Sequence, residues 1–323
     1  MKTIVIEAVL EGRPITHHVA QLIMGSGNFL RRDDAEHIDR MFDTFLGVGG
    51  NLIDTAHQYG RCERKIGEWL DRTGRRSELM ILTKGAHHDD GEPGARVHPR
   101  AITKDLLESL ERLRTDHVEL YALHRDDPSV EVGPIMEILN EHIEARRIHA
   151  IGASNWTHER IQAANDYAAA HGLVGFTFNS PNLSLAKCRV PRWEGCVSAG
   201  SDMCEWHTRN QLPLLSWSSQ AGGFFTGRFT PDVHDDAEMV KVYYTADNWE
   251  RYARADRLAE VKGVSRMEIA LSYVLHQPFP TAALVGMETV DEVLSSAAGL
   301  AVTLTEREVQ WLDLLEGGEG NAE

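Results

Sequence analysis

Two kinds of segment alternate along this chain. Short apolar runs, typical of buried strands, are separated in most cases by longer segments in which apolar residues recur three and four positions apart, as on one face of a helix. The expected strands span 21–24, 51–54, 78–85, 117–125, 148–153, 175–178, 212–217 and 281–285. The expected helices span 34–46, 63–71, 103–113, 132–145, 158–170 and 267–276.

This alternation predicts an α/β fold. Strands joined through helices form a parallel sheet with right-handed crossovers, and eight such strands favour a closed (β/α)8 TIM barrel over an open doubly wound sheet. Two β-prone runs, 2–10 and 15–25, are separated by EGRP and predict an N-terminal β-hairpin that plugs one end of the barrel. We expect a single domain over 1–323, because barrels reach this length as one domain.

Three connections that follow expected strands are longer than simple barrel turns: 86–99, 179–202 and 222–247. In barrel enzymes the loops at this end of the strands build the active site. We therefore expect these long βα loops to shape a substrate pocket. The alternative is that their aromatic residues only pack the loops against the barrel.

The composition narrows the classes of partner. The chain has 33 Lys and Arg against 49 Asp and Glu, a net charge of −16, which argues against nucleic acid or an anionic membrane as the main partner. No signal-like or membrane-spanning apolar run is present. The four cysteines lack CxxC or metal-finger spacing, which indicates reduced thiols. We expect a cytoplasmic protein without a resident metal.

Four polar side chains lie at or just beyond the ends of successive expected strands. Asp54 and Tyr59 follow one strand, Lys84 ends the next, and His124 ends the third. If these strands are parallel neighbours, the four side chains converge at one rim. A tyrosine acts as an acid near neutral pH only when its pKa falls from about 10, and a nearby ammonium held by a carboxylate has this effect. Taken singly, each residue is equally typical of a cap, packing or solvated surface.

The segments around these residues resemble those of a known family. They are NLIDTAHQYG, LTKG, YALHR, IGASNW, LLSWSS, GGFFTGR and LVGMETVDEV. With them, the sequence resembles the aldo-keto reductases over nearly its whole length, from Met24-Gly25 to the C-terminal helix. The resemblance implies a carbonyl reduction or alcohol oxidation in which Tyr59 donates the proton. It further implies that Lys84 and Asp54 lower the pKa of Tyr59 and that His124 orients the carbonyl or assists the proton transfer.

The chemistry requires such a set. When a hydride reaches a carbonyl carbon, negative charge grows on the oxygen, so a donor about 3 Å away must supply a proton. In the oxidation direction the same tyrosine acts as a base. No side chain can supply the hydride, so a nicotinamide cofactor is needed, either NAD(H) or NADP(H).

The resemblance also assigns cofactor-binding residues. Ser154 and Asn155 match the pair that bonds the nicotinamide carboxamide, and Trp217 matches the aromatic ring that stacks on the nicotinamide. Ser180 stands where many members have a glutamine, and Asn179 is the candidate to replace that contact. The residues that match the pyrophosphate loop and the cofactor glycines are Gly25, Ser218, Gly222, Gly227, Arg228 and Gly286. Because no GxGxxG motif opens a helix after a strand, a Rossmann domain is not indicated.

The adenosine end departs from the pattern of NADP-dependent relatives, in which an Arg or Lys binds the 2′-phosphate. Here Gly286-Met287 is followed by Glu288, with Thr289 and Glu292 beyond. A carboxylate repels a phosphate and accepts hydrogen bonds from a free ribose hydroxyl, which favours NAD(H). The alternative is that Glu288 points to solvent while Arg228 or another cation binds the 2′-phosphate.

The substrate is less well defined by the sequence. Arg125, Asp126 and Asp127 follow His124, and Trp193, Phe29, Phe224 and Phe225 lie in candidate lid loops. This mixture of polar groups and flat faces favours a small carbonyl or alcohol of sugar or polyol type over a steroid. The same residues are equally typical of loop caps and packing.

Two other classes of protein compete with a reductase. One is a redox-reporting nucleotide-binding protein, similar to the potassium-channel beta subunits, with little turnover. The other is a metal-dependent barrel hydrolase that uses the HHDD segment 87–90 with His124. The second needs ligands from several strand ends and usually an HxH motif on an early strand, which is absent here.

Overall fold

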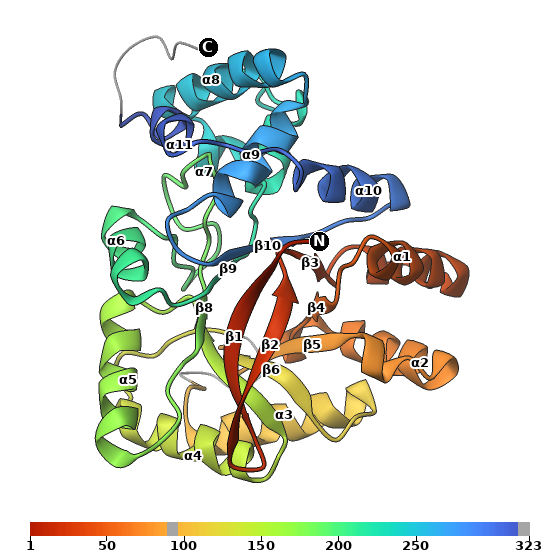
Figure 1. The fold of residues 1–323 in the computed structure, drawn as a ribbon, viewed down its shortest axis with the longest axis vertical. Helices are drawn as coiled ribbons and strands as arrows, with labels where there is room; N and C mark the ends of the chain where they lie inside the picture. Colours follow the sequence, from red (N-terminus) through yellow and green to blue (C-terminus); the bar gives the residue numbers. More distant parts are fainter. Residues whose placement is uncertain (89–95, 316–323) are drawn as a thin grey trace.

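Residues 1–88 and 96–315 are described by a computed structural model of the chain. In this part of the chain, eight parallel strands close into a barrel in the order β10-β3-β4-β5-β6-β7-β8-β9 (Figure 1). The strands are β3 (Leu22–Gly25), β4 (Leu52–Asp54), β5 (Met80–Gly85), β6 (Val118–Leu123), β7 (Ile148–Ser154), β8 (Phe178–Ser180), β9 (Leu214–Ser216) and β10 (Thr281–Val285). The (β/α)8 prediction is confirmed, with each expected strand present and its ends moved by a few residues.

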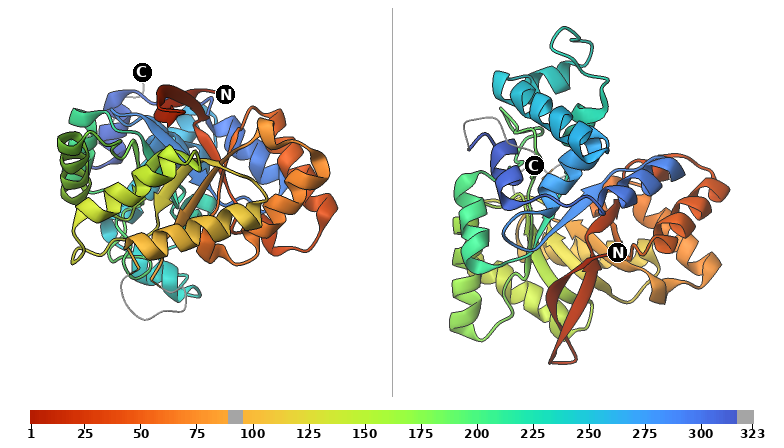
Figure 2. Two further views of the ribbon diagram at one scale, coloured as in Figure 1. Left: turned by 90° about the horizontal axis from the view of Figure 1, so that it is seen from below. Right: turned by 45° about the horizontal axis from the view of Figure 1, so that its top comes forward.

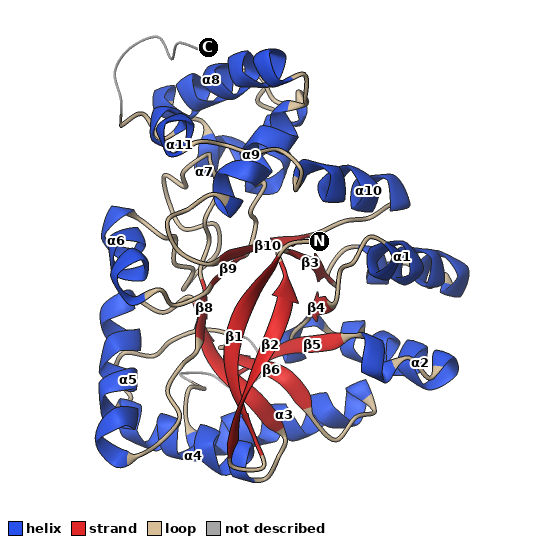
Figure 3. Cartoon of the chain, in the orientation of Figure 1, coloured by secondary structure: helices blue, strands red, loops and turns tan. Residues whose placement is uncertain are grey.

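Helices surround the barrel on its outer side (Figure 3). They are α1 (Ala35–Gly47), α2 (Cys62–Thr73), α3 (Pro99–Leu113), α4 (Val132–Glu144), α5 (His158–His171), α6 (Ser201–Asn210), α7 (Ala237–Tyr243), α8 (Ala246–Lys262), α9 (Arg266–Leu275), α10 (Val290–Gly299) and α11 (Glu306–Leu312). Short 3-10 turns are η1 (Phe29–Arg31), η2 (His57–Tyr59), η3 (Arg76–Glu78) and η4 (Ala221–Thr226). Of the described helices, none has the length and apolar character needed to cross a bilayer.

The sequence pattern did not predict α8, although it is 17 residues long. The buried side of this helix includes Asn248 and Arg251, so its inward face does not show the apolar repeat on which helix prediction depends. Asn248 is buried because its side chain bonds the backbone of Lys187 and Tyr243. The helix packs on α9 and α11 at one end of the molecule (Figure 2).

An N-terminal hairpin of β1 (Thr3–Leu10) and β2 (Arg13–Ala20) crosses one barrel opening, in front of the strands in Figure 1. The inward side chains of β1, among them Ile4 and Ile6, join a cluster with Leu82 and Leu120 inside the barrel. Asn51 fixes which opening this is. Its side chain accepts from the Ala20 backbone N–H and donates to His18 O, and it directly precedes β4. The predicted hairpin is thus present, and the end that it closes is the N-terminal one.

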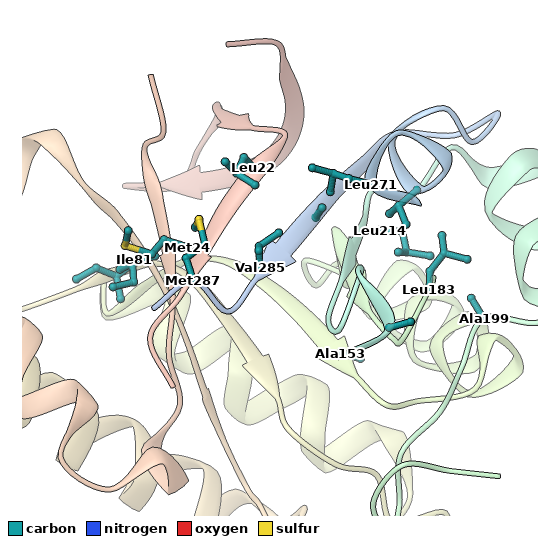
Figure 4. Packing of buried hydrophobic residues seen from close by; sticks show 14 of the residues in the cluster. Leu22, Met24, Ile81, Ala153, Leu183, Ala199, Leu214, Leu271, Val285 and Met287 are labelled. Atoms are coloured by element: carbon teal, nitrogen blue, oxygen red, sulfur yellow. The ribbon is translucent and has the colours of Figure 1, made fainter. Parts of the chain in front are cut away.

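The larger apolar cluster lies between the barrel wall and the helices. Its members come from strands and helices that are far apart in the chain, and Figure 4 shows part of it. Met24 and Ile81 lie on neighbouring parts of the wall, Val285 belongs to the closing strand, and Leu271 belongs to α9. With the N-terminal end closed and the wall covered by helices, the C-terminal rim is the end left for a site.

We expect Ile6→Ala to lower the free energy of unfolding by about 2–5 kcal/mol, because Ile6 is fully buried in the barrel plug and its loss leaves a cavity. Val5→Ala is the matched control. The neighbouring Val5 faces outward and is 45% exposed, so its truncation should cost about 0.5 kcal/mol or less. Urea unfolding followed by circular dichroism measures both. Equal costs for the two variants would show that the hairpin does not plug the barrel.

Candidate active site

Asp54, Tyr59, Lys84 and His124 meet at the C-terminal rim of the barrel. Asp54 ends β4, Lys84 lies in β5, and His124 follows β6. Tyr59 ends the turn η2, which leaves β4. The Tyr59 and His124 rings lie edge to face with centroids 5.6 Å apart, and Lys84 Nζ is 5.4 Å from the centroid of the Tyr59 ring. The structure thus brings together the four residues that strand order had placed at one rim.

Short-range backbone bonds set the position of Tyr59. The Thr55 N–H donates to Leu82 O of the neighbouring strand, and the Tyr59 N–H donates to Ala56 O within the turn. Gly60 then ends the turn at a φ of 61°, in the left-handed region that favours glycine. The tyrosine is therefore held one turn beyond β4, and 36% of it is exposed at the rim.

A buried ion pair lies behind the tyrosine. Lys84 Nζ donates to Asp54 Oδ1 and, at 3.0 Å, to Thr55 O. Lys84 is 2% exposed. Burial lowers the pKa of its ammonium, but Asp54 and Tyr59 together raise this pKa by more, so the pKa of Lys84 lies above its ordinary value. The site therefore contains a fixed positive charge next to the phenol.

Two opposing effects act on Tyr59. Burial raises the pKa of its phenol above the ordinary value, and the positive charge of Lys84 acts in the opposite direction. The lowering by Lys84 that the resemblance implies is thus present, but burial outweighs it in this structure. A raised pKa keeps the phenol protonated at neutral pH but makes it a weaker acid, so the positive charge of Lys84 is the feature of this site that favours loss of the proton.

His124 is a neutral imidazole at neutral pH. Burial lowers its pKa well below the ordinary value, and the nearby charges of Lys84 and Arg125 add to this effect. Its Nδ1 is enclosed and has no hydrogen-bond partner among the described residues. A neutral ring can donate from one nitrogen only, so protonation on Nε2 would make it a donor at the rim.

Ser154 ends β7 at the same rim, and Asn155 follows it. Ser154 Oγ donates to Ser180 O at 2.8 Å, and Asn155 Nδ2 donates to Ser154 Oγ and to His124 O. Asn155 has a φ of 61°, an uncommon conformation for a residue with a side chain and one that clusters at functional sites. The structure thereby connects the predicted carboxamide pair directly to the His124 backbone.

Trp217 contacts the same pair. Its Nε1 donates to Asn155 Oδ1 at 3.2 Å, and the Val197 N–H donates to the same oxygen at 3.1 Å. Asn155 therefore uses both amide hydrogens and both lone pairs within the protein. A bound carboxamide would have to replace one of these bonds.

Asn179 and Ser180 point in different directions, as neighbours on a strand must. Ser180 lies beside Ser154 in register and donates from Oγ to Leu215 O. Asn179 instead bonds His207 Nε2 on α6 at 3.1 Å, outside the barrel. The prediction that Asn179 replaces the missing glutamine contact therefore fails on direction, since its amide faces α6 and not the carboxamide pair.

The loop after β9 has the backbone of an anion site. Ser218, Ala221, Gly222, Gly223 and Gly227 all have positive φ values, between 48° and 91°. Successive residues in such conformations can turn their N–H groups towards one concave side, which binds phosphate in many proteins. Two of the five carry side chains and hold this conformation at a cost, which is typical of functional loops. These residues fit a pyrophosphate.

The structure adds two cations that the sequence did not single out. Arg192 reaches this loop from the β8–α6 loop (181–200): its Nη1 donates to Ser218 Oγ, and its Nε pairs with Glu238 at 2.6 Å. A Cβ on Gly227 would lie 3.3 Å from Arg266 Nη2. Neither arginine lies near the loop in the sequence, so no local motif could have found them. Arg228, which was predicted, is exposed.

Comparison with known proteins bears on these observations. The model of the Aldo/keto reductase family matches residues 21–316, which includes every residue placed at this rim. The chain belongs to the aldo/keto reductase family. Members of this family are oxidoreductases of small carbonyl compounds and alcohols and use nicotinamide cofactors.

Named relatives are similar over most of their length. Norsolorinic acid reductase B of Aspergillus parasiticus is 26% identical over 84% of this chain and 72% of that protein. Aldo-keto reductase YhdN of Bacillus subtilis is 28% identical over 75% of this chain and 72% of that protein. Aryl-alcohol dehydrogenase GME11368 of Pestalotiopsis microspora is 25% identical over 84% of this chain and 71% of that protein.

At two positions of this aldo/keto reductase, neighbouring atoms leave little room for a side chain larger than that of glycine. A Cβ on Gly25 would lie 3.2 Å from Val285 O on the adjacent strand β10. A Cβ on Gly286 would lie 2.8 Å from Asn28 Nδ2, which donates to Gly286 O. Barrel packing alone is thus sufficient reason for both glycines, and their contact with a cofactor stays a prediction.

The residues after β10 begin helix α10. Thr289 caps the helix by accepting from the Glu292 N–H, and Glu292 accepts from the Glu288 N–H at 2.6 Å. Thr289 and Glu292 therefore have structural tasks in this aldo/keto reductase. Glu288 is exposed, and its carboxylate, unlike that of Glu292, does not bond the start of the helix.

Several residues of the predicted substrate pocket are engaged elsewhere. Asp126 pairs with Arg160 at 3.2 Å, and Asp127 accepts from the Ser129 backbone and hydroxyl. The predicted aromatic residues Phe29, Phe224 and Phe225 are fully buried packing residues. Trp193, in contrast, is 49% exposed, and its ring lies 5.8 Å from that of Trp217. The Arg192 guanidinium lies over the Trp193 ring, 4.7 Å from its centroid, so only part of the Trp193 surface is open beside Trp217.

The HHDD segment lies partly outside the described residues, which do not include Asp89 and Asp90. The ring of His87 lies 4.7 Å from that of His124, and His87 stacks on His88. Among residues 1–88 and 96–315, no group of three His, Cys, Asp or Glu side chains is arranged to hold a metal ion. Membership of the aldo/keto reductases removes the reason for the hydrolase alternative.

We expect Asp54→Asn to destabilise this aldo/keto reductase by about 3–5 kcal/mol, because it leaves the buried Lys84 ammonium without a counter-charge. The double variant Asp54→Asn with Lys84→Met should recover part of that loss. Glu36→Gln removes an exposed pair with Arg40 and should cost less than about 1 kcal/mol. Urea unfolding measures all three. A double variant less stable than Asp54→Asn would contradict this account of the pair.

Proposed function

We propose that this protein interconverts a small carbonyl compound and its alcohol by hydride transfer to or from a nicotinamide cofactor, with Tyr59 as the general acid and base. One observation carries the proposal. A partly exposed phenol lies at the rim between a neutral His124 ring and the buried Lys84–Asp54 pair. This arrangement suits proton donation to an oxygen that becomes negative.

Each residue of the set has a distinct task. When bound, the nicotinamide cofactor supplies or accepts the hydride. Tyr59 gives its proton to the carbonyl oxygen, and Lys84 then stabilises the phenolate that remains. Asp54 holds the ammonium in place and prevents its loss through burial. His124, being neutral, orients the carbonyl through a hydrogen bond without competing for the proton.

The cofactor would lie across the C-terminal ends of β7 to β10. Ser154 and Asn155 would hold the carboxamide, and Trp217 would cover the nicotinamide ring. The positive-φ loop after β9 would receive the pyrophosphate, with Arg192 or Arg228 as counter-charge. Because Asn155 has no spare hydrogen-bonding position, binding would exchange its bond to Trp217 for one to the carboxamide. Tryptophan fluorescence should therefore report cofactor binding.

We expect Tyr59→Phe to lower kcat on simple aldehydes by about 10²–10⁴, because it removes the proton donor. Nucleotide affinity, measured by tryptophan quenching, should stay near that of the wild type. Tyr167→Phe is the matched control, since Tyr167 lies on α5 with its hydroxyl bonded to Glu137 and should leave kcat unchanged. Wild-type turnover in Tyr59→Phe would exclude Tyr59 as the acid. Tight nucleotide retention without turnover in the wild type would favour the redox-reporting alternative.

We further propose that NAD(H) is the preferred cofactor. Support comes from the exposed Glu288 carboxylate after β10, together with the engagement of Thr289 and Glu292 in the start of α10. A carboxylate next to the ribose accepts hydrogen bonds from two free hydroxyls and repels a 2′-phosphate.

Glu288→Arg should raise the ratio of kcat/KM with NADPH to kcat/KM with NADH by about tenfold or more, since it replaces repulsion of the 2′-phosphate by a charge-assisted hydrogen bond. Glu260→Arg makes the same charge change on the exposed side of α8 and should leave the ratio unaltered. Steady-state kinetics with both cofactors gives the two ratios. An unchanged ratio in Glu288→Arg would contradict the NAD(H) preference.

Two classes of test substrate are needed to identify what this protein acts on, namely sugars and aromatic aldehydes. The sugar or polyol substrate stays a prediction, and it has lost the support of Asp126, Asp127 and the three buried phenylalanines. The exposed face of Trp193 beside Trp217 suits a flat molecule, and one relative is named an aryl-alcohol dehydrogenase. Aromatic aldehydes therefore belong among the test substrates next to sugars.

A further inference from the structure

Arg125 directly follows His124, is 7% exposed, and has no carboxylate partner within residues 1–88 and 96–315. Four other cations near this rim do have one. The pairs are Lys84–Asp54, Arg96–Asp105, Arg160–Asp126 and Arg192–Glu238. Although the chain has a net charge of −16, none of the acidic side chains that the structure describes pairs with this guanidinium.

Backbone oxygens hold the Arg125 side chain in place. Its Nη1 donates to His124 O at 2.9 Å and its Nε to Glu194 O at 3.2 Å. A Cβ on Gly195 would lie 3.1 Å from Arg125 Cδ, so the β8–α6 loop lies directly against the stem of the side chain. The guanidinium is thereby fixed without its charge being neutralised.

The outer nitrogen of Arg125 is available. A guanidinium has five N–H donors, and two of those in Arg125 make the bonds to His124 and Glu194. Nη2 makes no hydrogen bond to a described residue. It is also not one of the polar side-chain atoms that are buried without a hydrogen-bond partner. It therefore opens onto space that water or a ligand can reach.

This open donor belongs to the site of Tyr59. The positive charge of Arg125 lowers the pKa of Tyr59, although burial, Lys84 and Asp54 each have a larger effect on it. It also lowers the pKa of His124, after burial and Lys84. The guanidinium is thus within electrostatic reach of both reacting side chains, while its sequence neighbours Asp126 and Asp127 are bonded away from it.

We propose that Arg125 binds a carboxylate of the substrate, so that this reductase acts on carbonyl compounds that also carry an acid group. A buried cation is unfavourable without a counter-charge, and a planar guanidinium with free N–H groups matches a carboxylate in shape and charge. A single unpaired cation balances one negative charge, which favours a carboxylate over a phosphate dianion. The proposal rests on the proposed function and names its substrate class.

A matched pair of substrates tests it. 4-Carboxybenzaldehyde and 4-formylbenzamide have the same size and a similarly activated aldehyde, but only the first is charged at neutral pH. The wild type should reduce the acid with a kcat/KM about tenfold or more above that for the amide, as expected for one charge-assisted hydrogen bond. In Arg125→Met this ratio of the two kcat/KM values should fall close to one.

Two further variants separate charge recognition from a role in holding the loop. Arg125→Lys keeps the positive charge but cannot make both backbone bonds, so its ratio should stay above that of Arg125→Met. Gly195→Ala disturbs the loop against Arg125 without a change of charge, so it should lower kcat/KM for both substrates alike. Thermal unfolding and NADH quenching show whether each variant is folded and binds cofactor.

The outcomes distinguish this inference from the proposed function. Equal kcat/KM values for the acid and the amide in the wild type would overturn the carboxylate site and leave the reductase intact. An Arg125→Met variant that loses the same factor on both substrates would likewise overturn it and assign Arg125 to the loop. No reduction of any aldehyde, despite NADH binding, would overturn the proposed function and this inference with it.

Discussion

The buried pair of Lys84 and Asp54 is the constraint on which the site depends. Both side chains point inward at the rim of the barrel, where an unpaired charge would be strongly unfavourable. Their strands must therefore lie side by side, as parallel pairing of β4 and β5 requires. The hairpin closes the opposite end of the barrel, and the side chains of Lys84 and Asp54 are only 3% and 6% exposed.

Much of this arrangement follows from the sequence. The apolar runs ending in Asp54 and Lys84 predict buried strands, and strand order alone brings these residues and His124 to one rim. The barrel was predictable for the same reason, because its strands are apolar on both faces. Helix α8 was not, since Asn248 and Arg251 occupy its buried side and are stabilised by bonds to residues distant in sequence.

The parts of the site that sequence reasoning missed depend on long-range contacts. Arg192 reaches the loop after β9 from a different connection, and nothing near Ser218 in the sequence indicates it. The sequence also could not predict which way the Asn179 side chain points. In a short strand, a shift of one residue decides whether an amide faces the site or a helix. Local patterns predict elements well, but they do not predict which side chains meet across loops.

Asn51 connects the N-terminal hairpin to the strand that carries Asp54, so changes at the N-terminus can affect the active-site end of the barrel. It is three residues before Asp54, and its side chain is bonded to the backbone of the N-terminal hairpin at His18 and Ala20. A peptide tag fused to Met1, or removal of the first strand, therefore acts on the same short segment that carries the aspartate of the ion pair.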